Sequence, residues 1–283
     1  MIHRWLSLIF WSHRLQAVRK VWLMMPLVML YSWGVTALEL SVLDGHLPKQ
    51  SNLAATLGAV LGLLLVFRTN TAYDRWWEGR KLWGQLVNDS RNLAIKSRIF
   101  AAENLADMQE FGRLITSFAF ELKDHLRAPL APPPDSAGAA PAASSLHVPM
   151  SVASRIVSRI MLWKRDARID GFETLMLDSH ARSLMDICGA CERIRKTPIA
   201  RGYLVFIRKC IMVYLVALPW GIVHDFGWLT VVVTAIVAYF MIGLELVAED
   251  VEEPFGHGSD DLHLDEYCRT IRSSVEEVMN APL

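Results

Sequence analysis

The composition of the chain disfavours an ordinary water-soluble enzyme. Of its 283 residues, 53% are hydrophobic and 20% are charged, and the mean hydropathy is +0.27, whereas soluble domains are usually more polar. The formal net charge is zero, but the two signs are separated along the chain. From Glu245 to the end there are eleven acidic residues and two arginines, so the preceding residues carry an equal positive excess. Four cysteines are too few for a disulfide scaffold.

The N-terminal half begins with membrane-type segments. Residues 1–20 combine an apolar patch with several basic residues and no small-residue cleavage site, which predicts an amphipathic interfacial helix. Residues 21–38 and 50–67 are uncharged, and a membrane span needs about 20 apolar residues. We therefore expect transmembrane helices 1 and 2 within residues 21–67.

Residues 68–198 form a charged middle region in which helices are expected. The pattern is helical over 68–127, then rich in Ala and Pro over 128–145, which predicts an extended linker. Helical patterns resume at 150–164 and 170–196 and end before Pro198. No strand periodicity is present, so the sequence predicts an all-α fold.

Transmembrane helices 3 and 4 are expected within residues 199–248. Residues 210–223 and 226–244 are uncharged, with a short turn around His224, Asp225 and Gly227 between them. The first of these stretches is short, and the basic residues Arg208 and Lys209 can reach the headgroups from its start. For each of the four apolar stretches, a buried core helix is the alternative. Residues 249–283 form an acidic tail.

The basic residues predict the orientation of the chain. They precede the first and third spans and follow the second, whereas the two loops on the other side carry few charges. The positive-inside rule then places both termini and the long middle region in the cytoplasm. We expect a multi-pass protein of the cell inner (plasma) membrane, with reduced cysteines and no nucleic-acid partner.

Catalytic signatures are absent from the sequence, which weakens the hypothesis of a membrane enzyme. Cys188 and Cys191 form a lone CxxC on a predicted helix. Zinc sites usually need a second ligand pair, and none lies at a suitable spacing. Structural packing is therefore favoured over metal or redox chemistry, and none of the nine scattered histidines is assigned a role.

One face of the second span is the most informative pattern. Ala59, Leu63 and Phe67 recur every four residues and share a helix face, while Gly58 and Gly62 beside them permit close helix approach. Several copies around an axis would give apolar rings of the kind that gate by dewetting. Lipid-facing or interhelical packing is the alternative, and the pattern alone favours that alternative.

Three sequence blocks resemble the bacterial branch of the bestrophin family. They are FRTNTAYDRWWEGRKLWG at 67–84, CERIRKTP at 191–198, and EEPFG at 252–256 followed by Asp260 and Asp261. Their order and spacing match the family, and the resemblance covers the chain apart from the Ala/Pro-rich linker.

The resemblance implies a homopentameric ion channel in the lipid bilayer. It implies four spans per subunit, a cytoplasmic helical part, and one axial pore whose neck is lined at Ala59, Leu63 and Phe67. The family neck is usually bulkier at the first position, so Ala59 implies a wider outer ring. A second constriction, the cytoplasmic aperture, matches Phe172. Anions such as chloride are the permeant ions by resemblance, and cations such as sodium are the alternative.

The tail departs from the calcium-binding pattern of eukaryotic bestrophins. Gly258 stands where a carboxylate ligand is expected, and calcium needs six to eight oxygens. We therefore expect no cofactor and no resident metal, with calcium as the less favoured alternative, and Asp260 and Asp261 remain a candidate cation-binding tail. A membrane-anchored interaction or sensor protein without conduction is the alternative function.

Overall fold

The computed structural model describes residues 16–42, 51–101, 104–129 and 147–281. The chain divides into two compact units. The first comprises residues up to Trp76 together with 198–253 and 257–261, and the second comprises 77–197, 254–256 and 262–283. Every regular element among the described residues is helical, which confirms the all-α prediction. Most of the segment 1–20, the 43–50 loop and nearly all of the Ala/Pro-rich linker lie outside the described residues.

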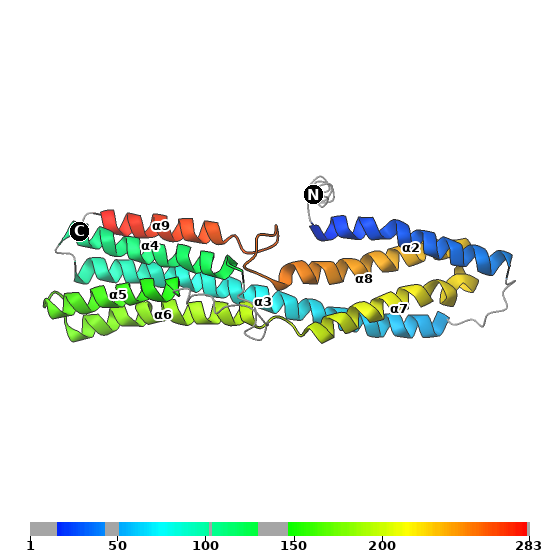
Figure 1. Cartoon of the computed structure of the whole chain (residues 1–283), viewed down its shortest axis with the longest axis horizontal. Coiled ribbons are helices and arrows are strands. Elements are labelled where there is room, and N and C mark those ends of the chain that lie inside the picture. The colour runs from blue at the N-terminus through cyan, green and yellow to red at the C-terminus, as the bar shows by residue number, and fades with distance from the viewer. Residues whose placement is uncertain (1–15, 43–50, 102–103, 130–146, 282–283) are drawn as a thin grey trace, which may run out of the picture. The chain divides into compact units, whose positions relative to one another are not determined.

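The first unit is built from long apolar helices. They are α2 (Gln16–Ser41), the first half of α3 (Ser51–Phe100), α7 (Arg201–Phe226) and α8 (Thr230–Glu252), with the short 3-10 helix η2 (Gly227–Leu229) between the last two. In Figure 1, α2, α7 and α8 lie side by side, in agreement with their mutual contacts. The buried side chains of α2, α3, α7 and α8 form one apolar core, which includes Leu65, Ile211 and Met241.

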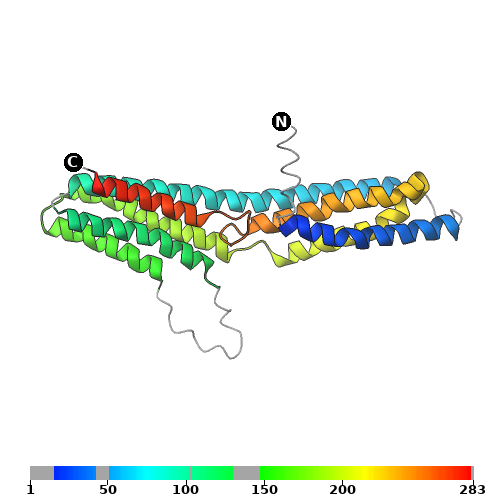
Figure 2. The same cartoon turned by 90° about the horizontal axis from the view of Figure 1, so that it is seen from above.

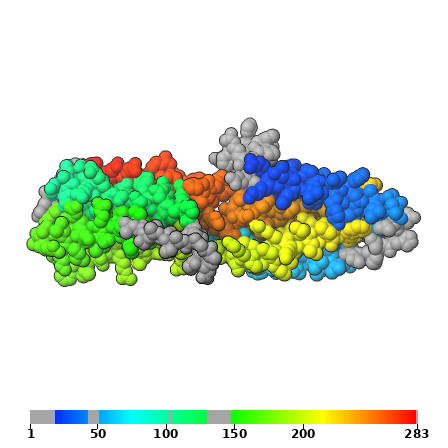
Figure 3. Space-filling view, viewed as in Figure 1, coloured from blue at the N-terminus to red at the C-terminus, as the bar shows by residue number. Residues whose placement is uncertain are grey.

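Among the residues that the structure describes, three helical stretches are long and apolar enough to cross a membrane. They are Arg19–Ser41, Ser51–Phe100 and Arg201–Glu252, and the third contains both α7 and α8. The outward surfaces of α2, α8 and α7 lie next to one another in Figure 3. The exposed side chains of these helices include many large apolar ones, among them Leu27, Val213 and Phe240. Such a surface is typical of helices that face lipid.

The turn between α7 and α8 lies slightly later than the sequence predicts. His224 and Asp225 belong to the last turn of α7, which ends at Phe226. Gly227 follows with φ +52°, a left-handed conformation that glycine adopts without steric cost. The chain reverses through η2, and His224 lies 3.1 Å from the fully buried Glu39 of α2.

The second unit is a helical bundle with its own core. It contains the second half of α3 together with α4 (Leu105–Arg127), α5 (Val148–Arg165), α6 (Gly171–Lys196) and α9 (Leu264–Asn280). Figure 2 shows α4 beside α5, and Figure 1 shows α9 along α4. Trp83, Phe111 and Trp163 are fully buried in it. The helical stretch expected over 68–127 is two helices, because α3 ends at Phe100 and Asn104 caps a new one by accepting the Ala106 N–H.

Local signals explain where α6 begins and how α9 packs. Asp170 and Glu173 form a capping box, each side chain accepting the backbone N–H of the other residue, at 2.7 and 2.8 Å. The acidic tail contains a packed helix, α9, whose apolar stripe is buried. That stripe meets α4 at Gly112, where an added Cβ would lie 2.9 Å from Cγ of Met279.

A half-buried aspartate joins α4 to α5 within the second unit. Asp107 accepts hydrogen bonds from Arg159, Arg168 and the Trp163 indole, at 2.5, 2.6 and 2.8 Å respectively. Burial opposes the charged form of Asp107, but the hydrogen bonds from Arg168 and Trp163 and the charge of Arg159 outweigh it and lower its pKa. The carboxylate of Asp107 is therefore held in its charged form at the start of α4.

Candidate functional site

The face of α3 that carries Ala59, Leu63 and Phe67 is exposed in the single chain. Leu63 is 57% exposed and Phe67 is 55% exposed, and Ala59 is exposed as well. The opposite side of the helix, at Leu61 and Leu65, is buried in the core of the first unit. The three sequence-predicted positions therefore share one outward apolar face, free to meet a neighbouring copy, lipid or a pore.

Gly58 allows α3 to approach α7 closely on the buried side. A Cβ at Gly58 would lie only 2.5 Å from the Tyr214 hydroxyl, whereas nothing lies within 4 Å of a Cβ at Gly62. Of the two glycines proposed for close helix approach, only Gly58 has this role among the residues that the structure describes. Gly62 lies beside the exposed face instead.

A buried charged cluster, which we call the Arg68 clamp, holds α3 against α8. Arg68 is fully buried, with its Nη2 2.7 Å from Oε2 of Glu252 and its Nε 3.6 Å from Oε2 of Glu245. The other carboxylate oxygen of Glu245 accepts from Nε of Arg208 at 3.0 Å. Glu245 and Glu252 are seven residues apart on α8 and so share one face. The clamp is defined by these four residues.

Backbone groups complete the clamp. Oε1 of Glu252 accepts the N–H of Ile199 at 3.1 Å, and the Glu252 carbonyl accepts Nε of Arg75 at 3.1 Å. Sequence reasoning missed this cluster because it treated the arginines only as flanking charges of spans. The available signal was the pair of glutamates at a seven-residue spacing, at the end of the fourth apolar stretch.

The clamp also determines which charges lie on the exposed face of α3. Of the charged residues between 51 and 76, Arg68 is buried, Arg75 is half-buried against Glu252, and Asp74 is exposed. Asp74 lies seven residues after Phe67, on the same helix face. The fixed charge on that face is therefore a carboxylate. Glu78, in the second unit, is bound by Arg193 at 2.7 Å.

Phe172 lies at an exposed apolar end of α6 in the second unit. Its side chain is 79% exposed, and Leu175 and Met176 beside it are also exposed. Phe172 lies within the capping box, between Asp170 and Glu173, so its position at the start of the helix is well defined. The structure thus presents an aromatic side chain to its surroundings at the expected aperture position.

Asp260 and Asp261 lie in a short loop of the first unit. Oδ2 of Asp261 accepts the Gly258 N–H at 2.5 Å, and the Asp260 carbonyl accepts the Trp76 indole N–H at 3.0 Å. Burial raises the pKa of Asp261, and the nearby carboxylates of Glu253 and Asp250 add to the rise, although the Gly258 N–H opposes it. One oxygen of Asp261 is therefore occupied by the backbone of the residue that replaces an expected ligand.

The CxxC cysteines are buried in the second unit. Cys188 and Cys191 are both free thiols, and burial raises the pKa of Cys188 to about 12, with the charge of Glu192 adding to it. A thiol with a raised pKa is a poor nucleophile. The geometry gives no support for redox chemistry between them.

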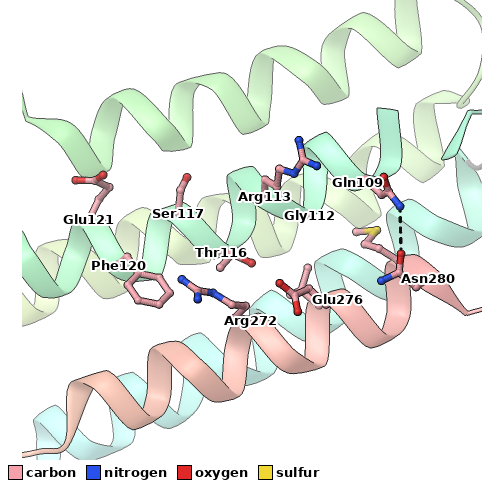
Figure 4. Close-up of a pocket in the computed structure, with 12 residues that line it drawn as sticks. Gln109, Gly112, Arg113, Thr116, Ser117, Phe120, Glu121, Arg272, Glu276 and Asn280 are labelled. Atoms are coloured by element: carbon pink, nitrogen blue, oxygen red, sulfur yellow. Dashed lines mark hydrogen bonds between the residues drawn. The ribbon is translucent and has the colours of Figure 1, made fainter. Parts of the chain in front are cut away.

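A surface groove lies between α4 and α9 in the second unit, with a volume of about 520 Å³. Figure 4 shows its polar lining, in which Gln109 donates to Asn280 at 3.2 Å and Arg272 lies over the Phe120 ring. Charges of both signs alternate along it, with Arg113 and Glu276 on its sides. No convergent acid, base and nucleophile occurs among these lining residues, and no sequence pattern indicated the groove.

Comparison with known proteins identifies the family. Residues 2–277 match the family described as bacterial/fungal bestrophin protein. A voltage-dependent anion channel-forming protein of Synechocystis sp. is 34% identical over 90% of this chain and 85% of its own length. One of that name from Escherichia coli is 30% identical over 80% of this chain and 76% of its own.

The fold is also similar to that of a solved structure. A bacterial bestrophin homologue from Klebsiella pneumoniae superposes with a TM-score of 0.81 at 22% identity, covering 92% of this chain and 98% of that one. This agreement concerns the fold, and the family assignment depends on the sequence matches. The chain therefore belongs to the bacterial and fungal bestrophin family.

Proposed function

We propose that this membrane protein is an anion channel, and that the exposed apolar face of α3 lines its axial pore. The observation that carries the proposal is the outward face at Ala59, Leu63 and Phe67, which the core of the first unit leaves uncovered. The anion channel-forming names of the relatives support a channel rather than an enzyme. Five copies around the pore axis would give rings of each side chain.

The proposed mechanism is passive conduction through a hydrophobic neck. Rings of Leu63 and Phe67 offer no hydrogen bonds, so an ion must shed part of its hydration shell to pass, and a narrow ring closes by dewetting. Large, weakly hydrated anions such as chloride lose water more easily than small cations. Ala59 gives a wider ring. Conduction needs no resident cofactor in this proposal, and removing calcium is expected to leave the current unchanged.

Cation conduction is the second candidate, because of Asp74. Its exposed carboxylate continues the neck face, with Asn70 between it and Phe67, and a ring of carboxylates attracts cations. Arg68 of the clamp cannot neutralise it from the same face, since Arg68 is buried. Asp74→Asn separates the two candidates: it should reduce a cation current strongly and an anion current little.

The proposed topology has four spans in the inner (plasma) membrane, made by α2, α3, α7 and α8. Both termini and the second unit then lie in the cytoplasm, where positively charged flanks are favoured. Phe172 would line a second, cytoplasmic aperture in the same pentamer. Chemical crosslinking of the purified protein should proceed to five subunits, and a limit at two would contradict the pentamer.

The decisive experiment measures the reversal potential of purified protein in planar bilayers under a KCl gradient. Reversal near the chloride equilibrium potential supports the anion channel, and reversal near the potassium potential supports the alternative. Phe67→Ala and Leu63→Ala should change conductance several-fold, whereas Leu27→Ala, at an exposed position of α2, is the matched control and should not. Absence of current at all voltages, or equal effects of neck and control variants, would refute the assignment of the pore face.

A further inference from the structure

A cluster of metal-ligating side chains lies in the second unit, remote in sequence from the expected pore and aperture positions. His125 is in the last turn of α4, His147 is the N-cap of α5, and Glu192 is on α6. The nearest ligand atoms of these three residues all lie within 4.8 Å of one another. Each is half-buried, so the cluster is sheltered but reachable by ions from solvent.

The two imidazoles converge on one carboxylate oxygen. Nε2 of His125 lies 2.8 Å and Nε2 of His147 lies 2.6 Å from Oε1 of Glu192, and the two rings are 4.6 Å apart between centroids. The other oxygen, Oε2, accepts from Nζ of Lys196 at 2.7 Å. Lys196 therefore orients Glu192 so that a single oxygen faces both histidines, and an outer hydrogen bond of this kind is typical of carboxylates that bind metal ions.

These three side chains suit a transition metal. Two imidazole nitrogens and a carboxylate oxygen, with water at the fourth position, fit a tetrahedral zinc-type ion, whereas Ca²⁺ and Mg²⁺ prefer sites made of oxygen ligands. Sγ of Cys188 lies 3.9 Å from Oε1 of Glu192, one helical turn earlier on α6, and is not one of the three converging groups. We propose that His125, His147 and Glu192 form a binding site for a divalent transition-metal ion of the zinc class.

Metal binding would be coupled to the start of α5. In the structure, Nδ1 of His147 accepts the Met150 N–H at 3.1 Å, so the ring proton is on Nε2 and points at Glu192. A metal at Nε2 requires that proton to move to Nδ1, and the Met150 N–H then loses its cap.

The test uses full-length, tag-free protein desalted after incubation with Zn²⁺ or Co²⁺. We expect one metal ion per chain, visible absorption of tetrahedral Co²⁺, and faster exchange of the Met150 amide in the metal-bound form. The variant His147→Asn removes a ligand but keeps a good N-cap residue, and it should lose at least tenfold in affinity. His180→Ala, a histidine of the same unit paired with Asp89, is the control and should retain wild-type binding.

Cys188→Ser is a second control, because Cys188 lies next to the cluster but is not one of its three converging ligands. It should retain wild-type Co²⁺ binding. Wild-type protein that retains no metal, or metal retained equally by His147→Asn, would overturn the site. A loss of binding in Cys188→Ser as large as that in His147→Asn would overturn the three-ligand assignment. None of these readouts depends on ion conduction, so failure of the channel proposal would not affect them.

Discussion

Replacing Arg68 by Met should destabilise the protein by about 3 kcal/mol. The variant removes a fully buried guanidinium whose Nη2 is 2.7 Å from Glu252, and breaking a buried ion pair from one side costs about 3–5 kcal/mol because the remaining charge is left uncompensated. The lower end applies here, because Glu252 keeps the Ile199 N–H and Glu245 keeps Arg208. Met replaces the unbranched stem of the lost side chain and so limits the cavity to the volume of the guanidinium.

The assay is the free energy of unfolding of the purified protein in mixed micelles, followed by tryptophan fluorescence during SDS titration. Arg208→Met is the matched control. Its side chain is 46% exposed, so its loss should cost less than about 1 kcal/mol. The double variant Arg68→Met/Glu252→Gln should recover part of the loss, because it removes the unpaired carboxylate. Equal costs for Arg68→Met and Arg208→Met, or no recovery in the double variant, would refute the reasoning.

Three further predictions concern the second unit. Asp107→Asn should lower the free energy of unfolding by about 2 kcal/mol at neutral pH. Because the pKa of Asp107 in the folded protein is lowered from its ordinary 3.8, its stabilising contribution is complete above pH 3.8 and is lost as the pH falls through the folded-state pKa. Unfolding curves measured across this pH range should therefore show a shallower loss of stability with acid in the variant than in the wild type. Gly112→Ala should destabilise the protein by about 1 kcal/mol, because the added methyl group would press on α9. Gly189→Ala should stabilise it by about 0.5–1 kcal/mol, because an added Cβ there would meet no described atom within 4 Å. Thermal unfolding that ranks the two variants the other way would contradict this prediction. Cys191 and Cys268 are buried, and burial raises the pKa of both thiols, that of Cys268 to about 12. Both should therefore resist a thiol reagent at pH 8 until denaturant is added. Rapid labelling of these two cysteines in the native protein would contradict this prediction.

Elements that depend on local chemistry could be predicted from the sequence. The start of α6 follows from Asp170 and Glu173 at capping-box spacing, and its end follows from Pro198 two residues beyond Lys196. The apolar helices follow from hydropathy, because each carries enough apolar length by itself. The outward face at Leu63 was also readable, since residues at i and i+4 share a helix face. Its role in a pore remains a prediction.

Features that depend on distant pairing could not be predicted. Arg68 and Glu252 are 184 positions apart, and the basic residue alone is indistinguishable from a charge flanking a membrane span. The His125 and Glu192 contact likewise joins different helices. The helix α9 was missed for another reason: the net acidic charge of the tail masks the apolar stripe that begins at Leu264, although that stripe has helical spacing.

The Arg68 clamp has a consequence for the rotation of α3 about its own axis. Successive residues of an α-helix are about 100° apart, so holding Arg68 toward α8 fixes the azimuth of Phe67, its neighbour, to a different side of the helix. Packing among apolar side chains is tolerant of substitution and would by itself permit a helix to turn by a few degrees. A directional charge pair resists such turning. Substitutions on the lipid-type surfaces of α2, α7 and α8 can therefore accumulate while the direction in which Phe67 points stays the same.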